Sequence, residues 1–385
     1  MQNYQSKTSQ WIAESLRSPL RAVFILIALI VAVSPLITAL PNHPGRDYVN
    51  VVLLCIIFSI VALGLNVVTG LTGLLDIGVV VFASIGAYTA AILYDRQWMQ
   101  FPFSFVVVLI AGGLHAAVWG LIRGAPTLRL SGDYYAIVTL AFAEIVRIVQ
   151  RNESWLTGGG QGLKGYPAVN LWGAKLTGGE YEGLLRSDGV WRYDKVLGYD
   201  GLWFGNTIEF YYLCLVILAL TILAVWRLEN SRTGRAWLAI KADETSAMSS
   251  GVNLARYKMT AFAISAFIAG VGGALLGFRN NVISTTFFDT WFSVIILCCV
   301  VLGGMGSIAG VLGGTFIVTG LSEALRWGLK TLDIPDDSRL LFFGALLVVV
   351  MLFRPQGLIT RSRAKPTDIP PDSENNSLYQ IGGGS

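Results

Sequence analysis

The sequence is poor in charge. Only 14% of its 385 residues are Asp, Glu, Lys or Arg, whereas 54% are hydrophobic. A soluble domain carries about 25% charged residues, so a chain with this little charge cannot cover a surface that faces water. The mean hydropathy of +0.61 agrees. The composition therefore argues against an ordinary soluble domain and indicates a membrane protein.

Histidine, cysteine and nucleotide-binding motifs are scarce as well. The chain has two histidines and four cysteines, so we expect no metal site and no disulfide framework. It contains no Gly-Lys dipeptide, and hence no G-x-x-x-x-G-K-[ST] loop to hold ATP. The net charge of +4 needs no nucleic acid to explain it, because positive residues accumulate on cytoplasmic loops. We expect no cofactor and no enzyme activity.

Long runs of apolar residues without charge are abundant in the sequence. A helix needs roughly 20 apolar residues to cross the hydrocarbon core of a bilayer, and most of these runs reach that length. They predict an all-α, polytopic membrane protein with about ten transmembrane helices, some of them broken or short. The expected helices cover about 21–40, 49–69, 73–94, 102–122, 134–150, 209–228, 257–278, 290–304, 308–328 and 339–353.

The positions of the basic residues provide a check on the predicted number of transmembrane helices. They gather in three regions: before the first helix, between the sixth and seventh, and after the last. Even numbers of crossings place all three on the cytoplasmic side, as the positive-inside rule requires. The chain then divides into a cytoplasmic segment 1–20, a transmembrane domain 21–353 with an external loop 151–208 and a cytoplasmic loop 229–256, and a tail 354–385. The tail is rich in Pro, Ser, Asn and Gly, and we expect it to be largely disordered.

Glycine is concentrated in two apolar segments, TGLTGLLDIG (69–78) and LGGMGSIAGVLGG (302–314). Interrupted, glycine-rich segments in both halves of a transporter indicate the substrate path. The candidate path or gate residues here are Gly70, Gly73, Gly303 and Gly306. The second interpretation is close helix packing, since Gly306, Gly310 and Gly314 are spaced to form one smooth helix face. The two interpretations are compatible.

Two acidic residues lie within or beside the apolar runs. Asp76 must face protein, a water-filled cavity or a helix end, because a carboxylate in the bilayer centre costs about 2.5–3.5 kcal/mol. We consider an interfacial N-cap and a place on the path as equal alternatives. Glu144 and Arg147 are three residues apart on an expected helix and therefore share a face. They form either a structural ion pair or a gate near the outer mouth.

The stretch TGGGQGLKG (157–165) contains the pattern G-x-G-x-x-G at Gly160, Gly162 and Gly165. A dinucleotide site of this kind needs a preceding strand and a helix that opens at the third glycine. Here a membrane helix precedes the motif and Pro167 follows it. We interpret the glycines instead as a sharp turn through positive φ at the external mouth, where Gly160 and Gly162 could present N–H groups to a substrate carboxylate.

The cytoplasmic loop contains a helical pattern at 234–249, with Gly251 as its stop signal and a membrane helix directly after it. A short charged helix held between two membrane helices suits docking to a cytoplasmic partner. A solvated loop is the alternative.

At this point the chain resembles a known family, the LivM-type inner-membrane permeases of bacterial branched-chain amino-acid ABC importers, over roughly 48–360. The segments that carry the resemblance are GLNVVTGLTGLLDIGVVVFASIGAY, LRLSGDYYAIVTLAFAEIVRIV, LTGGGQGLKG, GRAWLAIKADETSAMSSGVN, VVLGGMGSIAGVLGG and FRPQGLI.

The resemblance implies a second permease as heterodimer partner, two cytoplasmic ABC ATPase subunits and an external substrate-binding protein, all working at a lipid bilayer. The segment 234–253 corresponds to the ATPase-coupling loop, a divergent relative of E-A-A-x-x-x-G. Its expected coupling residues are Arg235, Asp243, Glu244, Ala247 and Gly251, while Thr245 and Ser246 depart from the motif.

The resemblance leaves the cargo open. Branched-chain or other hydrophobic amino acids come first, and urea or short amides are the alternative. An ion-coupled secondary transporter is the alternative from another class, but it would need several intramembrane carboxylates, and only Asp76 and Glu144 are candidates.

Overall fold

The computed structural model describes residues 46–94, 105–128, 130, 132–164, 207–280 and 282–331. The predicted helices 21–40 and 339–353, the segment 1–20, most of the loop 151–208 and the tail 354–385 lie outside these ranges. The described elements are α3 (Arg46–Asn66), η1 (Val67–Thr72), α4 (Val79–Tyr94), α5 (Phe105–Thr127), α6 (Asp133–Asn152), α7 (Ser154–Thr157), β1 (Leu163–Lys164), α8 (Thr207–Glu229), α9 (Arg232–Ala242), α10 (Glu244–Ser249), α11 (Leu254–Asn280), β2 (Val282–Ile283), η3 (Thr285–Phe288), α12 (Thr290–Gly303) and α13 (Ile308–Thr331).

The described helices are those of a multi-pass membrane protein. Among the described residues, four helical segments are long and apolar enough to cross a bilayer: Val49–Thr72, Phe105–Thr127, Phe210–Glu229 and Leu254–Asn280. Three shorter apolar helices accompany them: Val79–Leu93, Thr290–Gly303 and Ile308–Ser322. The helical, polytopic class is therefore confirmed, and the count of ten crossings stays a prediction.

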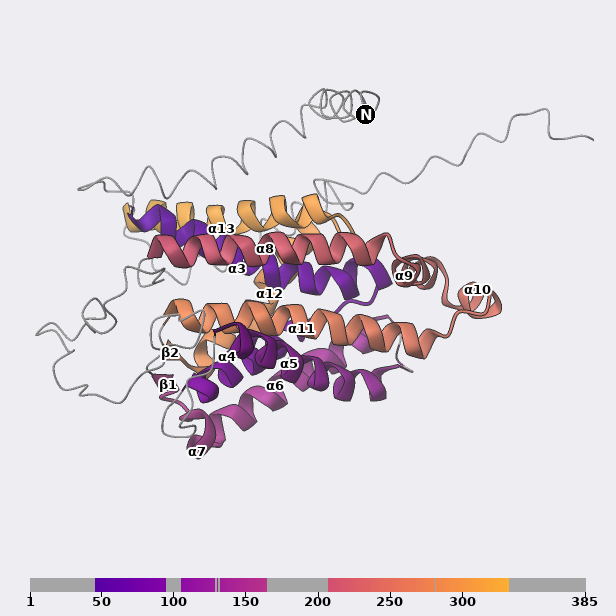
Figure 1. Cartoon of the computed structure of the whole chain (residues 1–385), viewed down its shortest axis with the longest axis horizontal. Helices are drawn as coiled ribbons and strands as arrows, with labels where there is room; N and C mark the ends of the chain where they lie inside the picture. The colour runs from indigo at the N-terminus through magenta and orange to yellow at the C-terminus, as the bar shows by residue number, and fades with distance from the viewer. Residues whose placement is uncertain are drawn as a thin grey trace, which may run out of the picture.

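Helix α11 lies at the centre of the bundle, with α3, α8 and α13 on one side of it and α4, α5 and α6 on the other (Figure 1). It packs most extensively against α5, α4 and α3. Glycine makes this packing close: a Cβ on Gly86 of α4 would collide with the carbonyl of Gly270 in α11, and one on Gly273 would collide with the carbonyl of Ala83. Small residues that let helix backbones touch are typical of membrane bundles.

The bundle has two distinct ends (Figure 1). Helices α9 and α10 lie at one end, which we call the α10 end, and α7, β1 and β2 lie at the other, the β1 end. The strands form an antiparallel ladder of two residues each, in which Leu163 faces Ile283. This ladder is a small β element that the all-α prediction did not include.

The predicted helix 73–94 is wrong at its start. Helix α3 continues as the π-helix η1, which ends at Gly73 with φ +80°, and α4 begins only at Val79. The residues between them leave the helical path, because a residue with positive φ cannot continue a right-handed helix. The chain is thus interrupted between its first two described membrane helices.

The predicted continuous glycine face at 306–314 is also wrong. Gly306 has φ +89° and lies in the break between α12 and α13, whereas Gly310 and Gly314 are on α13. A Cβ on Gly303 would collide with the Gly310 carbonyl, and one on Gly314 with the Cys299 carbonyl. The packing interpretation therefore holds for the pair on α13, and Gly306 belongs to a second interruption.

Candidate functional site

The two interruptions of the chain meet inside the bundle. The Asn66 side chain at the end of α3 accepts a hydrogen bond from the Gly306 N–H, with Oδ1 and N 2.8 Å apart. A Cβ on Gly70 would lie 2.6 Å from that same Gly306 nitrogen. Residues 240 positions apart in sequence are thus joined by a hydrogen bond between a side chain and the backbone. Glycine fits at position 70 because an added Cβ would collide with both the Asn66 side-chain Oδ1 and the backbone of the other break.

Asp76 lies in the first break and is fully buried. Its Oδ1 accepts a hydrogen bond of 2.8 Å from the Gly78 N–H, directly before α4. This bond is an Asx turn that lies ahead of α4, whose N-cap position is Gly78, and Asp76 is buried inside the bundle. The predicted interfacial N-cap is therefore wrong. A buried carboxylate needs a partner of opposite charge, and α5 supplies one.

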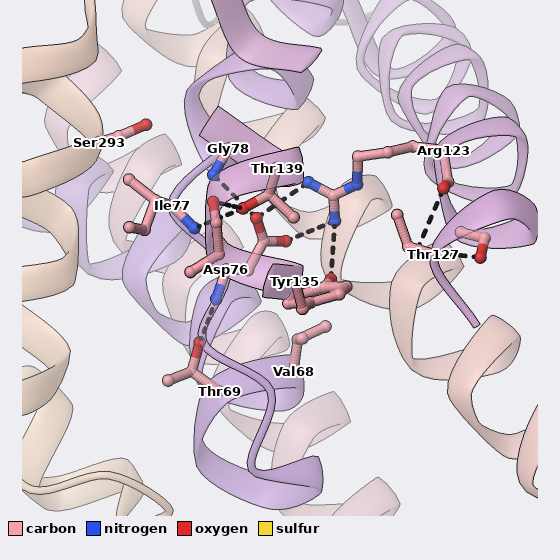
Figure 2. A network of polar contacts seen from close by, with 12 residues as sticks. Val68, Thr69, Asp76, Ile77, Gly78, Arg123, Thr127, Tyr135, Thr139 and Ser293 are labelled. Carbon is pink, nitrogen blue, oxygen red and sulfur yellow. Dashed lines mark hydrogen bonds and ion pairs between the residues drawn. The ribbon is translucent and has the colours of Figure 1, made fainter. Parts of the chain in front are cut away.

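Arg123 is that partner (Figure 2). Its Nη1 donates to Asp76 Oδ1 at 2.9 Å and its Nη2 to Oδ2 at 2.5 Å, a bidentate ion pair. Arg123 is 2% exposed, and its guanidinium carbon lies 4.5 Å from the centre of the Phe82 ring. Two parallel N–H···O bonds of this kind add geometric specificity. The pair fixes the first break against α5.

Tyr135 and Thr139 of α6 complete the surroundings of the pair (Figure 2). The Tyr135 hydroxyl accepts a long bond of 3.4 Å from Arg123 Nη2, and the Thr139 hydroxyl accepts the Ile77 N–H at 3.2 Å. The first break is thus held from two neighbouring helices, α5 and α6. It is an ordered structural feature, although it lacks regular secondary structure.

Arg123 was not among the site residues expected from the sequence. The uncharged run 97–122 ends just before it, and the expected helix 102–122 stopped at the same point. Helix α5 continues through Arg123 to Thr127. The signal that could have found it was the predicted burial of Asp76, since one uncompensated carboxylate in an apolar region implies a cation on a neighbouring helix.

Glu144 and Arg147 form the predicted ion pair on α6, with Arg147 Nε 3.0 Å from Glu144 Oε2. Both side chains are partly exposed, at 39% and 36%. They line a pocket of about 360 Å³ at the β1 end, and Gly160 lines it too. The structure thus brings together one predicted gate residue and one predicted mouth residue. The other residues of the pocket wall are Ile148, Arg151, Thr285, Thr286 and Asp289.

The glycines of TGGGQGLKG form a turn, as predicted. Gly158, Gly159 and Gly162 have positive φ, and Gly162 leads into β1. A Cβ on Gly162 would collide with the carbonyl of Ile283, the residue that pairs with Leu163. The prediction is wrong for Gly160, which has no positive φ and whose added Cβ would meet nothing within 4 Å.

The predicted single helix 234–249 is wrong, because two helices fill this segment. Helix α9 ends at Ala242, Asp243 adopts an extended conformation with φ −162°, and α10 follows. The Asp243 side chain accepts the Ser246 N–H at 2.6 Å and thereby caps α10. This bond to the charged form lowers the pKa of the Asp243 carboxyl below its ordinary value. An aspartate that competes for backbone N–H groups starts a new helix more readily than it continues an old one.

The end of α10 confirms Gly251 as a stop signal. Gly251 has φ +83°, and two backbone bonds close the turn, Val252 N–H to Ala247 O and Gly251 N–H to Met248 O. This pattern is a Schellman motif, which favours glycine at the left-handed position. Ala247 is buried, at 4% exposure.

Two further bonds hold this segment on α11. Glu244 pairs with Lys258 at 2.7 Å, and Lys258 is buried. The indole of Trp237, fully buried, donates to the Tyr257 carbonyl at 2.8 Å. The segment α9–α10 is therefore packed onto the bundle, which excludes the solvated-loop alternative for this part. Arg235, by contrast, is exposed, and its guanidinium donates a long bond of 3.4 Å to the Asn230 carbonyl.

Comparison with known families decides the class of protein. A family model described as the permease component of the branched-chain amino acid transport system matches residues 48–351. The chain belongs to this permease family. The match spans both breaks, the Asp76–Arg123 pair and the segment α9–α10.

Curated relatives agree with the family. This permease is 38% identical over 349 residues to the high-affinity branched-chain amino acid transport system permease protein LivM of Escherichia coli K12, covering 90% of this chain and 77% of that one. The LivM protein of Salmonella typhimurium is 36% identical over 344 residues, covering 89% and 75%. The LivH permease protein of E. coli K12 is 27% identical over 312 residues, covering 79% and 91%. No solved structure matches.

Proposed function

We propose that this permease is the subunit of a bacterial ABC importer that forms, with a second permease, the path for branched-chain amino acids across the inner membrane. The observation that carries the proposal is the family match over 48–351. The names of the LivM relatives in E. coli and Salmonella supply the substrate class.

The segment α9–α10 is the proposed contact with two ABC ATPase subunits. It lies at the α10 end (Figure 1), it presents Arg235 and Asp243 to solvent, and it is fixed to α11. In this proposal the α10 end faces the cytoplasm, as do both termini after ten crossings, and the β1 end faces the external substrate-binding protein. Positive charge in the loop 229–256 supports that orientation.

The proposed translocation path runs beside the two breaks. Backbone that leaves helical geometry at membrane depth is tolerated where it is buried in protein or lines a cavity, and Gly70, Gly73, Gly303 and Gly306 bring two such segments together. The pocket with Glu144 and Gly160 is the proposed external mouth. Its wall offers both carboxylate and guanidinium groups, which match the two charged ends of an amino acid.

The second permease is proposed as a different chain related to this one. The similarity to LivH proteins indicates that two related permeases of this family exist in one organism.

Helix α8 presents an exposed apolar face that includes Val216, Leu220, Leu223 and Trp226. Such a face suits lipid, whereas the charged pair on α6 suits a protein-lined or water-filled surface.

The ion pairs favour ATP over an ion gradient as the driving force. An ion-coupled transporter needs carboxylates that can bind or release a cation. Within the described ranges, both candidate carboxylates, Asp76 and Glu144, are already paired with arginines. Neither is available as an ion site without breaking its pair.

Uptake by cells tests the proposal. A strain that lacks this gene should accumulate less ¹⁴C-leucine than the parent strain, and a plasmid copy should restore uptake. Unlabelled isoleucine and valine should compete with leucine, whereas urea should not. Uptake of labelled urea that depends on this gene, with no change in leucine uptake, would contradict the proposed cargo.

A further inference from the structure

Lys241 connects the segment α9–α10 to both breaks. It lies in the last turn of α9, and its Nζ donates a hydrogen bond of 2.7 Å to the Gly70 carbonyl in η1. Its stem packs on Gly73, where an added Cβ would lie 3.1 Å from the Lys241 Cγ. A Cβ on Gly306 would lie 3.0 Å from the Gly70 oxygen and 3.8 Å from Nζ. One ammonium group therefore sits where the two breaks meet.

The bond from Lys241 satisfies a backbone carbonyl near the C-terminal end of the helix α3–η1. The last four carbonyls of a helix have no partner within it, and the helix dipole concentrates negative charge there. Gly70 lies near the end of the continuous helix α3–η1, which stops at Gly73. A lysine near a helix C-terminus can satisfy such a carbonyl, and a charged donor makes a stronger bond than a neutral one. Here the lysine comes from a separate element.

The segment that carries Lys241 is also tied to α11 at two further points, through Trp237 and through the Glu244–Lys258 pair. At the breaks, the Asn66 side chain accepts a hydrogen bond from the Gly306 N–H, and the Lys241 ammonium donates one to the Gly70 carbonyl. A displacement of α9–α10 must therefore either carry the Gly70 carbonyl with it or break the Lys241 bond. In the first case the close approach of Gly70 to Gly306 changes.

We propose that Lys241 is a positioning residue for transport, which couples movement of α9–α10 to the two breaks. This inference rests on the proposed function, in which ATPase subunits move that segment. The side chain touches no substrate. Its ammonium transmits displacement to the Gly70 carbonyl and, through the close approach of the two glycines, to Gly306.

The test uses the purified complex of this permease with its second permease, its ATPase subunits and its binding protein, reconstituted in liposomes. Two quantities are measured: ¹⁴C-leucine accumulated and ATP hydrolysed. Lys241→Met keeps the apolar stem and removes the ammonium, and Lys241→Arg keeps a cationic donor. We expect Lys241→Met to retain its ATPase subunits and to lower the ratio of leucine to ATP about tenfold, because a bond to a charged donor is lost. Lys241→Arg should restore at least half of the ratio.

Arg256→Met is the matched control, because Arg256 is an exposed cation close to the same segment, and its loss changes the charge equally. It should leave the ratio unchanged. A normal ratio in Lys241→Met, an equal fall in Arg256→Met, or loss of the ATPase subunits from Lys241→Met would each overturn the inference. Failure of the proposed function is distinguishable, since the unaltered complex would then accumulate no leucine.

Discussion

At the scale of single residues, the buried pair of Asp76 and Arg123 has the largest expected effect on stability. Removing one partner of a buried ion pair leaves the other charge without compensation and costs about 3–5 kcal/mol, whereas replacing both is often neutral. Both side chains are almost fully buried, at 0% and 2% exposure. The pair is therefore expected to behave as a unit.

Asp76→Asn should lower the apparent melting temperature of the permease in detergent strongly. The amide oxygen can still accept the Gly78 N–H, so the loss reports the pairing with Arg123 and not the turn before α4. Adding Arg123→Leu removes the uncompensated guanidinium and should recover most of the loss. A double variant that is less stable than Asp76→Asn alone would contradict this account of the pair.

Gly160 and Gly162 provide a second residue-scale test, with one glycine as the control for the other. Gly162→Ala places a side chain at φ +72° and against the Ile283 carbonyl, so we expect a loss of about 1–2 kcal/mol from the backbone conformation alone. Gly160→Ala meets no atom and should melt like the unaltered protein. Equal melting temperatures for the two variants would mean that the β1–β2 ladder does not form as described.

At the scale of elements, α10 depends on its two ends. Asp243 caps its start and Gly251 its end. Nothing lies within 4 Å of a Cβ built on Gly251, so substitution there tests backbone conformation and not space. Asparagine tolerates the left-handed conformation, and β-branched residues do not.

Gly251→Val should therefore reduce the amount of ATPase subunit that co-purifies with the permease, while Gly251→Asn should retain most of it. The comparison is made by pull-down of tagged permease at equal expression. If Gly251→Val retains as much ATPase as the unaltered chain, then α10 is not the contact with the ATPase that we propose.

The elements also show which features a sequence can predict. Runs of apolar residues predicted the ends of α5, α6, α8, α11 and α12 to within a few residues. This is possible because the length of an apolar run can be read from the local sequence. A gap between the first two of the described membrane helices was predicted, but the second helix was started too early, at position 73. The split at Asp243 was missed, although an aspartate that can cap is a local signal. The contacts of Arg123 with Asp76 and of Lys241 with Gly70 depend on how distant helices pack, and no local pattern specifies them.

At the scale of the whole molecule, the α10 end and the β1 end of the bundle have different proposed roles. The α10 end carries the proposed ATPase contact, and the β1 end carries the pocket with Glu144, Arg147 and Gly160. Between them lie the breaks, held by Asp76–Arg123 on one side and Lys241 on the other. Coupling between distant sites requires an element with two arrangements that both sites influence. The two breaks are the proposed element of that kind.

The dependence of leucine uptake on ATP tests the central claim most directly. Liposomes that contain the complete complex are loaded with ATP and treated with ionophores that abolish proton and sodium gradients. We predict that ¹⁴C-leucine accumulates at the same rate with and without ionophores and stops when ATP is replaced by a non-hydrolysable analogue. Uptake that ceases with ionophores, or that continues without hydrolysable ATP, would contradict the assignment of this permease to an ATP-driven importer.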